Sequence, residues 1–233
     1  MSTTHESSPS TSSTSETTPS ASLNPLTSHG LHLQVTFLWT KFRNEIAIKG
    51  SNGTLTPLYI MHRRPLKPQL RYERVSDTTT TTTTIGTGSI NTFSIDSTCT
   101  LHAQEIHLKP LKRWKTQYNY LSHALGGIPL SWIANSTLKE WDFVCVNSVT
   151  QEPVAKFSVN WWAVKEVGNF YFDGKVREGV RDEIVVTGLT LLYVMTTRMN
   201  NPFHLLGAAF ARPGKVEEEG MEMRDGGGKM KVA

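Results

Sequence analysis

The strongest constraint on the fold is a segment near the C-terminal end whose middle has almost no polar side. It spans residues 181–200 and reads RDEIVVTGLTLLYVMTTRMN. On a helical wheel its apolar side chains cover every side, and such a helix must be enclosed by protein or lie in a membrane. Spanning a bilayer takes about 20 apolar residues, and this run is shorter. The segment therefore predicts a helix buried inside the protein.

Both ends of the segment carry helix signals. Asp182 is a candidate N-cap, and Glu183 suits the positive N-terminal end of a helix dipole. Arg198 suits the opposite end, and the Asn-Asn-Pro sequence that follows is a stop signal. These residues predict a helix over 183–199. A buried strand pair is the alternative, because residues 184–187 are mostly β-branched, but the length without a turn favours the helix.

Composition separates a folded region from two tails. The chain has 233 residues, of which 38% are hydrophobic and 19% charged, and both values lie below the globular average. Residues 1–28 are rich in Ser, Thr and Pro, and residues 213–233 are charged and rich in Gly, so we expect both to be disordered. The predicted folded domain is 31–212. Within it, the threonine run at 78–84 is expected to be a loop.

Short strands dominate the predicted domain. Asn52-Gly53 is a strong hairpin signal between two alternating runs, and residues 148–151 separate two more. We expect a further strand pair at 89–96 and 98–108. Closely spaced short strands favour an antiparallel barrel or sandwich. Neither a βαβ alternation nor a GxGxxG motif is present, so a nucleotide-binding α/β fold is not expected.

Three stretches in this order resemble the tubby C-terminal-like superfamily, which includes tubby proteins, phospholipid scramblases and LURP-one-related proteins. They are WDFVCVNSVTQEPVAKFSV at 141–159, VGNFYFDG at 167–174 and DEIVVTGLTLLYV at 182–194. The likeness spans residues 33–199 and is greatest to small fungal-type members. It implies a mainly β fold, a closed antiparallel β-barrel around a central hydrophobic C-terminal helix.

Two basic clusters are the candidate ligand-binding residues. One lies within residues 62–74 and the other within residues 109–118. Clustered cations attract anionic lipid head groups by ~1 kcal/mol each, and the resemblance implies such use because tubby proteins bind phosphoinositides. A solvated basic surface is the alternative. The candidate lipid-binding residues are Arg63, Arg64, Lys67, Arg71, Lys112, Arg113 and Lys115.

The remaining polar residues indicate no catalytic site. His102 and His107 do not have the spacing of a metal site, so neither a metal nor a cofactor is expected. Cys145 lies between valines and is expected to be a buried, inert thiol. Trp114 and Tyr118 could stack on nucleic-acid bases beside the second basic cluster, but no nucleic-acid-binding motif supports this partner.

The sequence thus predicts a non-enzymatic binding module for anionic phospholipid head groups or for a protein partner. The net charge of +4 is compatible with an anionic partner. The N-terminal sequence MSTTHESSPS lacks the basic and apolar regions of a signal peptide. A cytoplasmic location without a transmembrane segment is expected, with peripheral attachment to a membrane surface. Two alternatives remain: a small enzyme with a pocket at the barrel mouth, and a nucleic-acid-binding β-barrel.

Overall fold

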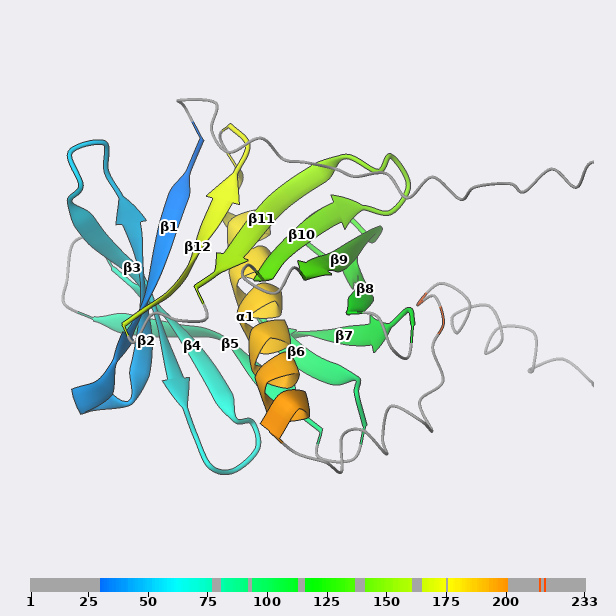
Figure 1. Cartoon of the computed structure of the whole chain (residues 1–233), viewed down its shortest axis with the longest axis horizontal. Helices are drawn as coiled ribbons and strands as arrows, with labels where there is room; N and C mark the ends of the chain where they lie inside the picture. Colours follow the sequence, from blue (N-terminus) through cyan, green and yellow to red (C-terminus); the bar gives the residue numbers. More distant parts are fainter. Residues whose placement is uncertain are drawn as a thin grey trace, which may run out of the picture.

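A closed antiparallel β-barrel around one long helix is the architecture of the chain (Figure 1). The computed structural model describes residues 30–76, 81–91, 94–112, 116–136, 141–160, 165–174, 176–200, 214 and 216. The strands are β1 (His32–Leu38), β2 (Arg43–Lys49), β3 (Leu55–Arg63), β4 (Leu70–Val75), β5 (Thr82–Ile90), β6 (Ser97–Leu101), β7 (Gln104–Pro110), β8 (Gln117–Ser122), β9 (Ile128–Ser136), β10 (Trp141–Asn147), β11 (Pro153–Val159) and β12 (Glu166–Phe172).

Each strand pairs with its neighbour along the chain, and β1 pairs with β12 to close the barrel. Closure leaves no open sheet edge for another chain to pair with. In such an up-and-down barrel, successive connections alternate between the two ends. The β1–β2 and β3–β4 connections therefore lie at one end, and the β2–β3 and β4–β5 connections lie at the other.

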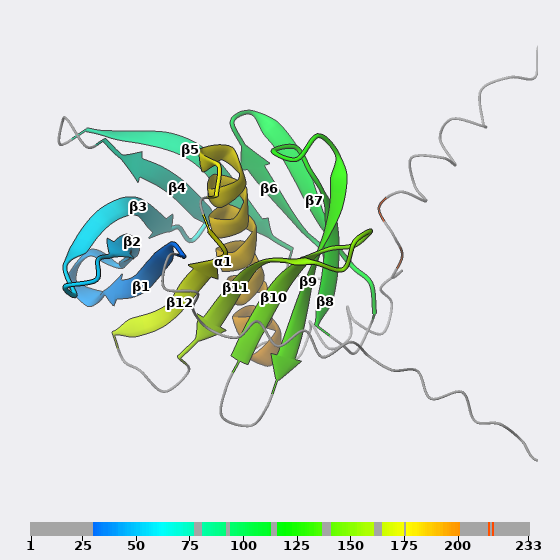
Figure 2. The ribbon, with the colours of Figure 1, turned by 90° about the horizontal axis from the view of Figure 1, so that it is seen from above.

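The helix α1 (Glu178–Asn200) fills the barrel and faces strands on all sides (Figure 2). From residue 182 to residue 195 every side chain is buried. Leu191 and Leu192 point in different directions, yet their exposed fractions are 0% and 4%. The predicted central helix is confirmed, and the alternative of a buried strand pair is wrong.

The helix begins at Glu178 rather than at Glu183. The prediction that Asp182 is the N-cap is therefore wrong, because this residue lies inside the first turns. Its carboxylate does not cap the helix backbone. It bonds instead to side chains of the barrel wall, which the sequence pattern around residue 182 could not indicate.

A glycine allows the helix to pack closely against aromatic residues of the wall. A Cβ atom on Gly188 would lie 2.9 Å from the Phe170 ring and 3.1 Å from the Trp132 ring. Phe170 in turn stacks on Phe157, with ring centroids 4.0 Å apart. Gly188 thus makes room for aromatic side chains rather than for a second backbone.

Several strand boundaries differ from the prediction. The hairpins around Gly53, which has a φ of 79°, and around residues 148–151 are confirmed. The threonine-run loop is partly wrong because β5 starts at Thr82 and continues to Ile90. The strand expected at 89–96 is also wrong: residues 91–96 join β5 to β6, and residues 98–108 contain the β6–β7 hairpin. The strands β8 and β9 were not predicted from the sequence.

The predicted tails lie largely outside the described residues. Residues 1–28, and residues 78–80 of the threonine run, are not described. In the predicted C-terminal tail, Gly214 and Val216 are described, and both bond to the side chain of Asn119 on β8. These two residues are therefore held against the barrel wall by Asn119.

Candidate functional site

One end of the barrel gathers exposed apolar and basic side chains. The connection η1 (Trp39–Lys41) joins β1 to β2, and residues 64–69 join β3 to β4. Arg43 of β2 pairs with His62 of β3, so the two connections are neighbours. We call this region the basic–aromatic end, and it comprises Trp39, Phe42, Arg63, Arg64, Leu66 and Lys67.

Its apolar side chains are unusually exposed for their size. The exposed fractions are 62% for Trp39, 59% for Phe42 and 76% for Leu66. The two aromatic rings contact the buried ring of Phe37 edge-on, with centroid distances of 4.8 Å and 5.7 Å. A buried aromatic base therefore supports both rings while they face outward.

Three cations of the basic–aromatic end have no carboxylate partner within the part of the chain that the structure describes. Among the described residues, none of Arg63, Arg64 and Lys67 forms an ion pair. Lys67 donates a hydrogen bond of 2.7 Å to the side-chain oxygen of Asn91. The Arg63 guanidinium lies 4.7 Å from the ring centroid of Tyr193 near the end of α1, and also over Phe42. Contact with aromatic rings orients an arginine without neutralising it.

The other predicted ligand residues lie apart from this group. Arg71 on β4 is paired with Glu73, with an Nη2–Oε1 distance of 2.5 Å, so its charge is already offset. Lys112 is exposed just after β7, and β5 and β6 separate it from β4 around the wall. Arg113 and Lys115 lie outside the described residues.

The opposite end holds a buried carboxylate with several partners, which we call the Asp182 cluster: Asp182, Tyr59, Arg74, His102 and Arg181. Asp182 has an exposed fraction of 1%. Its Oδ1 accepts from the Tyr59 hydroxyl at 2.5 Å, and its Oδ2 is bonded to Arg74 and lies 3.2 Å from His102 Nε2. Arg181 Nε donates to the Tyr59 oxygen at 2.8 Å. These contacts join α1 to β3, β4 and the β6–β7 turn.

The Asp182 cluster has the geometry of a structural clamp rather than of an acid–base site. Both carboxylate oxygens of Asp182 are engaged by side chains of the barrel, which hold the carboxylate in place between α1 and the wall. Burial, followed by the nearby Asp182 charge, raises the pKa of Tyr59 above its ordinary range and keeps the phenol protonated. Among the described residues, no group of three His, Cys, Asp or Glu side chains could hold a metal ion.

The two cysteines lie in the barrel interior. Cys99 and Cys145 are free thiols with exposed fractions of 0%. Burial raises the pKa of Cys99 to about 12 and also raises the pKa of Cys145. A thiol that stays protonated is a poor nucleophile. The expected burial of Cys145 is confirmed.

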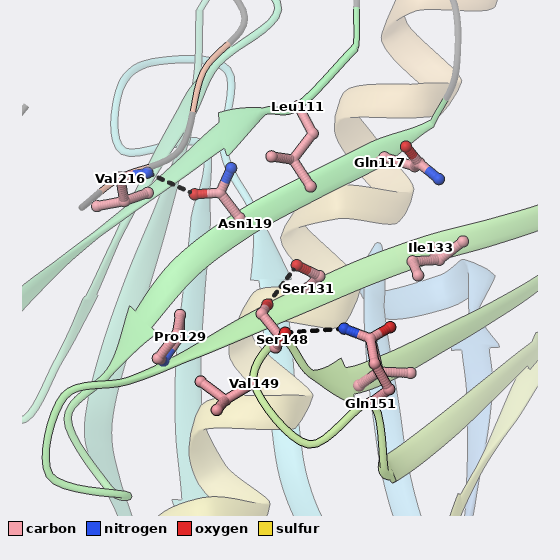
Figure 3. A pocket seen from close by; sticks show the side chains of 11 residues that line it. Leu111, Gln117, Asn119, Pro129, Ser131, Ile133, Ser148, Val149, Gln151 and Val216 are labelled. Carbon is pink, nitrogen blue, oxygen red and sulfur yellow. Dashed lines mark hydrogen bonds between the residues drawn. The ribbon is translucent and has the colours of Figure 1, made fainter. Parts of the chain in front are cut away.

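A groove with a volume of about 410 Å³ lies on the outer face of β8, β9 and β10 (Figure 3). Its walls combine apolar and uncharged polar side chains, among them Leu111, Asn119, Ile133, Val149 and Val216. No pattern in the sequence indicated this site, because its residues come from three strands, a hairpin turn and the C-terminal tail.

No protein-family model matches the chain, and no curated protein matches it either. Within the described residues, no helix is both long enough and apolar enough to cross a membrane. The basic–aromatic end is the region whose exposure and charge most resemble a binding surface.

Proposed function

We propose that this chain is a non-enzymatic module that binds an anionic membrane surface through the basic–aromatic end, with phosphoinositide head groups as the preferred ligand. One observation carries the proposal: three large exposed apolar side chains share one end of the barrel with three cations that form no ion pair with a described residue. Exposed apolar residues rimmed by polar ones mark interaction surfaces.

The apolar part of this surface suits the boundary between lipid head groups and acyl chains. Trp39 and Phe42 lie in and beside the β1–β2 connection, and Leu66 is at the middle of the β3–β4 connection. Binding of a peripheral protein grows with the apolar area it inserts and with attraction to anionic lipids. Side chains on short loops at a barrel end can enter the head-group layer without disturbing the strands.

The cationic part suits phosphate. Arg63 is oriented by two aromatic rings, so less conformational freedom is lost when it binds. An arginine offers planar, paired donors that match phosphate oxygens, and a lysine adds a compact positive charge. Each cation near an anionic bilayer adds ~1 kcal/mol of attraction.

Two further considerations support this function over its rivals. The resemblance of residues 33–199 to the tubby-like superfamily favours lipid binding, as an argument by analogy. For the enzyme alternative, the Asp182–His102 pair is the nearest candidate, but its carboxylate is buried and bonded to Tyr59 and Arg74 as well as to His102. Among the described residues, the hydroxyl that joins this pair is that of Tyr59, and burial raises the pKa of Tyr59, which disfavours the phenolate that a nucleophile would need.

The test compares the full chain with the Arg64→Ala/Lys67→Ala variant in sedimentation with phosphatidylcholine vesicles, with and without phosphatidylinositol bisphosphate. Losing two cations at ~1 kcal/mol each predicts binding about 30-fold weaker. Raised salt should weaken binding of the parent chain more than that of the variant.

Lys49→Ala/Arg177→Ala is the matched control. Both residues are exposed at the opposite end of the barrel, so the variant loses the same charge elsewhere. Its binding should stay near that of the parent. A parent chain that does not bind the anionic vesicles, or an equal loss in both variants, would overturn the proposed site.

A further inference from the structure

The groove on β8, β9 and β10 contains side chains that point outward from the barrel and are nevertheless buried. Along these strands Tyr118 and Trp132 face the core, so Asn119 and Ser131 face outward. Even so, Asn119 and Ser131 are each only 5% exposed. Outward side chains of a barrel wall normally meet solvent, and these do not because other parts of the chain lie over them.

Two segments provide this cover. The β10–β11 turn is held down by a hydrogen bond of 2.7 Å between the hydroxyls of Ser131 and Ser148, and Val149 of that turn lines the groove. The second segment is the C-terminal tail at Gly214 and Val216 (Figure 3).

The side chain of Asn119 binds the backbone of this tail. Its Nδ2 donates to the Gly214 carbonyl oxygen at 3.0 Å, and its Oδ1 accepts from the Val216 N–H at 3.0 Å. The Gly214 N–H donates to the Pro110 carbonyl oxygen at 3.3 Å. An amide side chain that satisfies a carbonyl and an N–H two residues apart recognises extended backbone, much as a neighbouring strand would.

From this arrangement we propose that the groove is an intramolecular peptide-binding site, and that its occupant is the chain's own C-terminal segment, residues 214–223. Asn119 holds the backbone at the entrance, and Val216 occupies the first apolar position. Beyond it the groove still presents apolar side chains, of which Val149 is 72% exposed. Met221 and Met223 are the next apolar residues of the segment and match this surface.

The segment after Val216 is long enough to cross the groove from β8 to β10. Crossing from β8 to β10 takes two strand spacings, about 10 Å. An extended chain covers at most ~3.3–3.6 Å per residue, so the five residues after Val216 span up to ~17 Å and bring Met221 across. Residues 217–219 are glutamates, and Lys112 is exposed next to the groove residue Leu111, which gives the acidic stretch a nearby cation.

The experiment uses the full chain with a nitroxide spin label on a cysteine introduced by Met221→Cys. Both natural thiols are buried, so the label goes to the new cysteine. In methyl NMR spectra, the label should broaden the signals of Ile133 and Val149, whereas Ile46, across the barrel on β2, should stay sharp. A diamagnetic label provides the reference intensities.

Two variants test whether Asn119 holds the segment. Val216→Pro removes the N–H that Asn119 accepts and changes no residue of the barrel, so it should abolish the broadening while the other methyl signals keep their positions. Asn119→Ala should have the same effect from the groove side. Val232→Pro, the same substitution near the end of the tail, is the control and should leave the broadening intact.

Absence of broadening in the labelled parent would overturn the proposal, and so would broadening that survives Val216→Pro. A second copy of the chain is the other possible occupant. A mixture tests it, in which one chain carries the spin label without isotopes and the other carries the isotopes without a spin label. Broadening of Ile133 and Val149 in that mixture would mean that the groove binds a second copy, which also contradicts the intramolecular site. None of these readouts depends on membrane binding.

Discussion

The two ends of the barrel use charge in opposite ways. At the end where α1 begins, Asp182 is buried and its partners Arg74 and His102 come from different strands and turns. At the end where α1 finishes, Arg64 and Lys67 are exposed and form no ion pair with a described residue. The same fold thus contains a buried charge with protein partners at one end and an exposed group of cations beside apolar side chains at the other.

This difference separates stability from binding. A buried carboxylate with a complete set of partners holds elements together, and removing it leaves the partners without compensation. Exposed cations contribute little to folding but attract any anionic surface nearby. Substitutions at the Asp182 cluster should therefore change unfolding, and substitutions at the basic–aromatic end should change binding.

The largest effect is expected from Asp182→Ala. The substitution leaves the Tyr59 hydroxyl and the Arg74 guanidinium without their buried acceptor, which should cost about 3–5 kcal/mol of unfolding free energy. Urea unfolding followed by circular dichroism measures it. Glu105→Ala is the control, because the exposed Glu105–His107 pair should contribute only about 0–1 kcal/mol. Similar losses in the two variants would mean that the buried partners of Asp182 contribute no more than an exposed ion pair.

Between the two ends, the middle of α1 shows how much unfolding free energy comes from burying apolar side chains without any charge. Leu191→Ala and Leu192→Ala should each lower the unfolding free energy by about 2–5 kcal/mol, because both side chains are enclosed by the barrel. Thermal melts of the two variants provide the measurement, with Leu55→Ala, which is 45% exposed, as the control. A variant at Leu191 or Leu192 that melts like the parent chain would contradict complete enclosure.

The apolar part of the basic–aromatic end should give a smaller effect. Trp39→Ala removes a ring of which only part would enter the head-group layer, so binding to anionic vesicles should fall by about 1 kcal/mol, or about fivefold. The dependence on salt should remain that of the parent, since no charge changes. Vesicle sedimentation at several salt concentrations tests this. A changed salt dependence would mean that Trp39 acts by positioning the cations instead.

The smallest effect concerns Glu73, which lies between the two ends. Burial acts to raise its pKa, but hydrogen bonds from Thr82 and His62 and the charge of Arg71 outweigh burial, so the pKa lies below its ordinary value of 4.5. A lowered pKa in the folded state stabilises the protein above the unfolded-state pKa, and this contribution is lost as the pH falls through the folded-state value.

Glu73→Gln should therefore reduce the loss of stability below pH 4.5, as measured by urea unfolding at a series of pH values. Glu105→Gln, at an exposed position, should leave the acid dependence of the parent unchanged. An acid dependence that is the same in Glu73→Gln as in the parent would show that the ion pair with Arg71 contributes nothing, and would return Arg71 to the group of available cations.

Local patterns sufficed for much of the fold. The apolar wheel around Leu191 predicted an enclosed helix because no open surface could accept it, and Asn52-Gly53 predicted a hairpin from turn chemistry alone. Patterns failed where polar side chains interrupt the alternation. In β8, Tyr118 and Tyr120 are buried in the barrel, but the next position on that face is the polar Ser122, which is also buried, while the apolar Leu121 is half-buried on the other face, so the strand shows no clear apolar face.

The sequence by itself determined that a mainly β chain encloses a hydrophobic helix, and that cations gather around residues 63–71. Burial requirements and residue composition act locally, so they can be read along the chain. Only the tertiary structure decided which charges stay available, because Arg71 meets Glu73 across a short distance on β4 while Arg74 meets Asp182 from the far end of the chain. Pairing of β2 with β3 likewise made the β1–β2 and β3–β4 connections neighbours, and the return of the tail to β8 placed the Val216 N–H against Asn119. These contacts follow from strand order and register, which depend on the whole barrel rather than on any one segment.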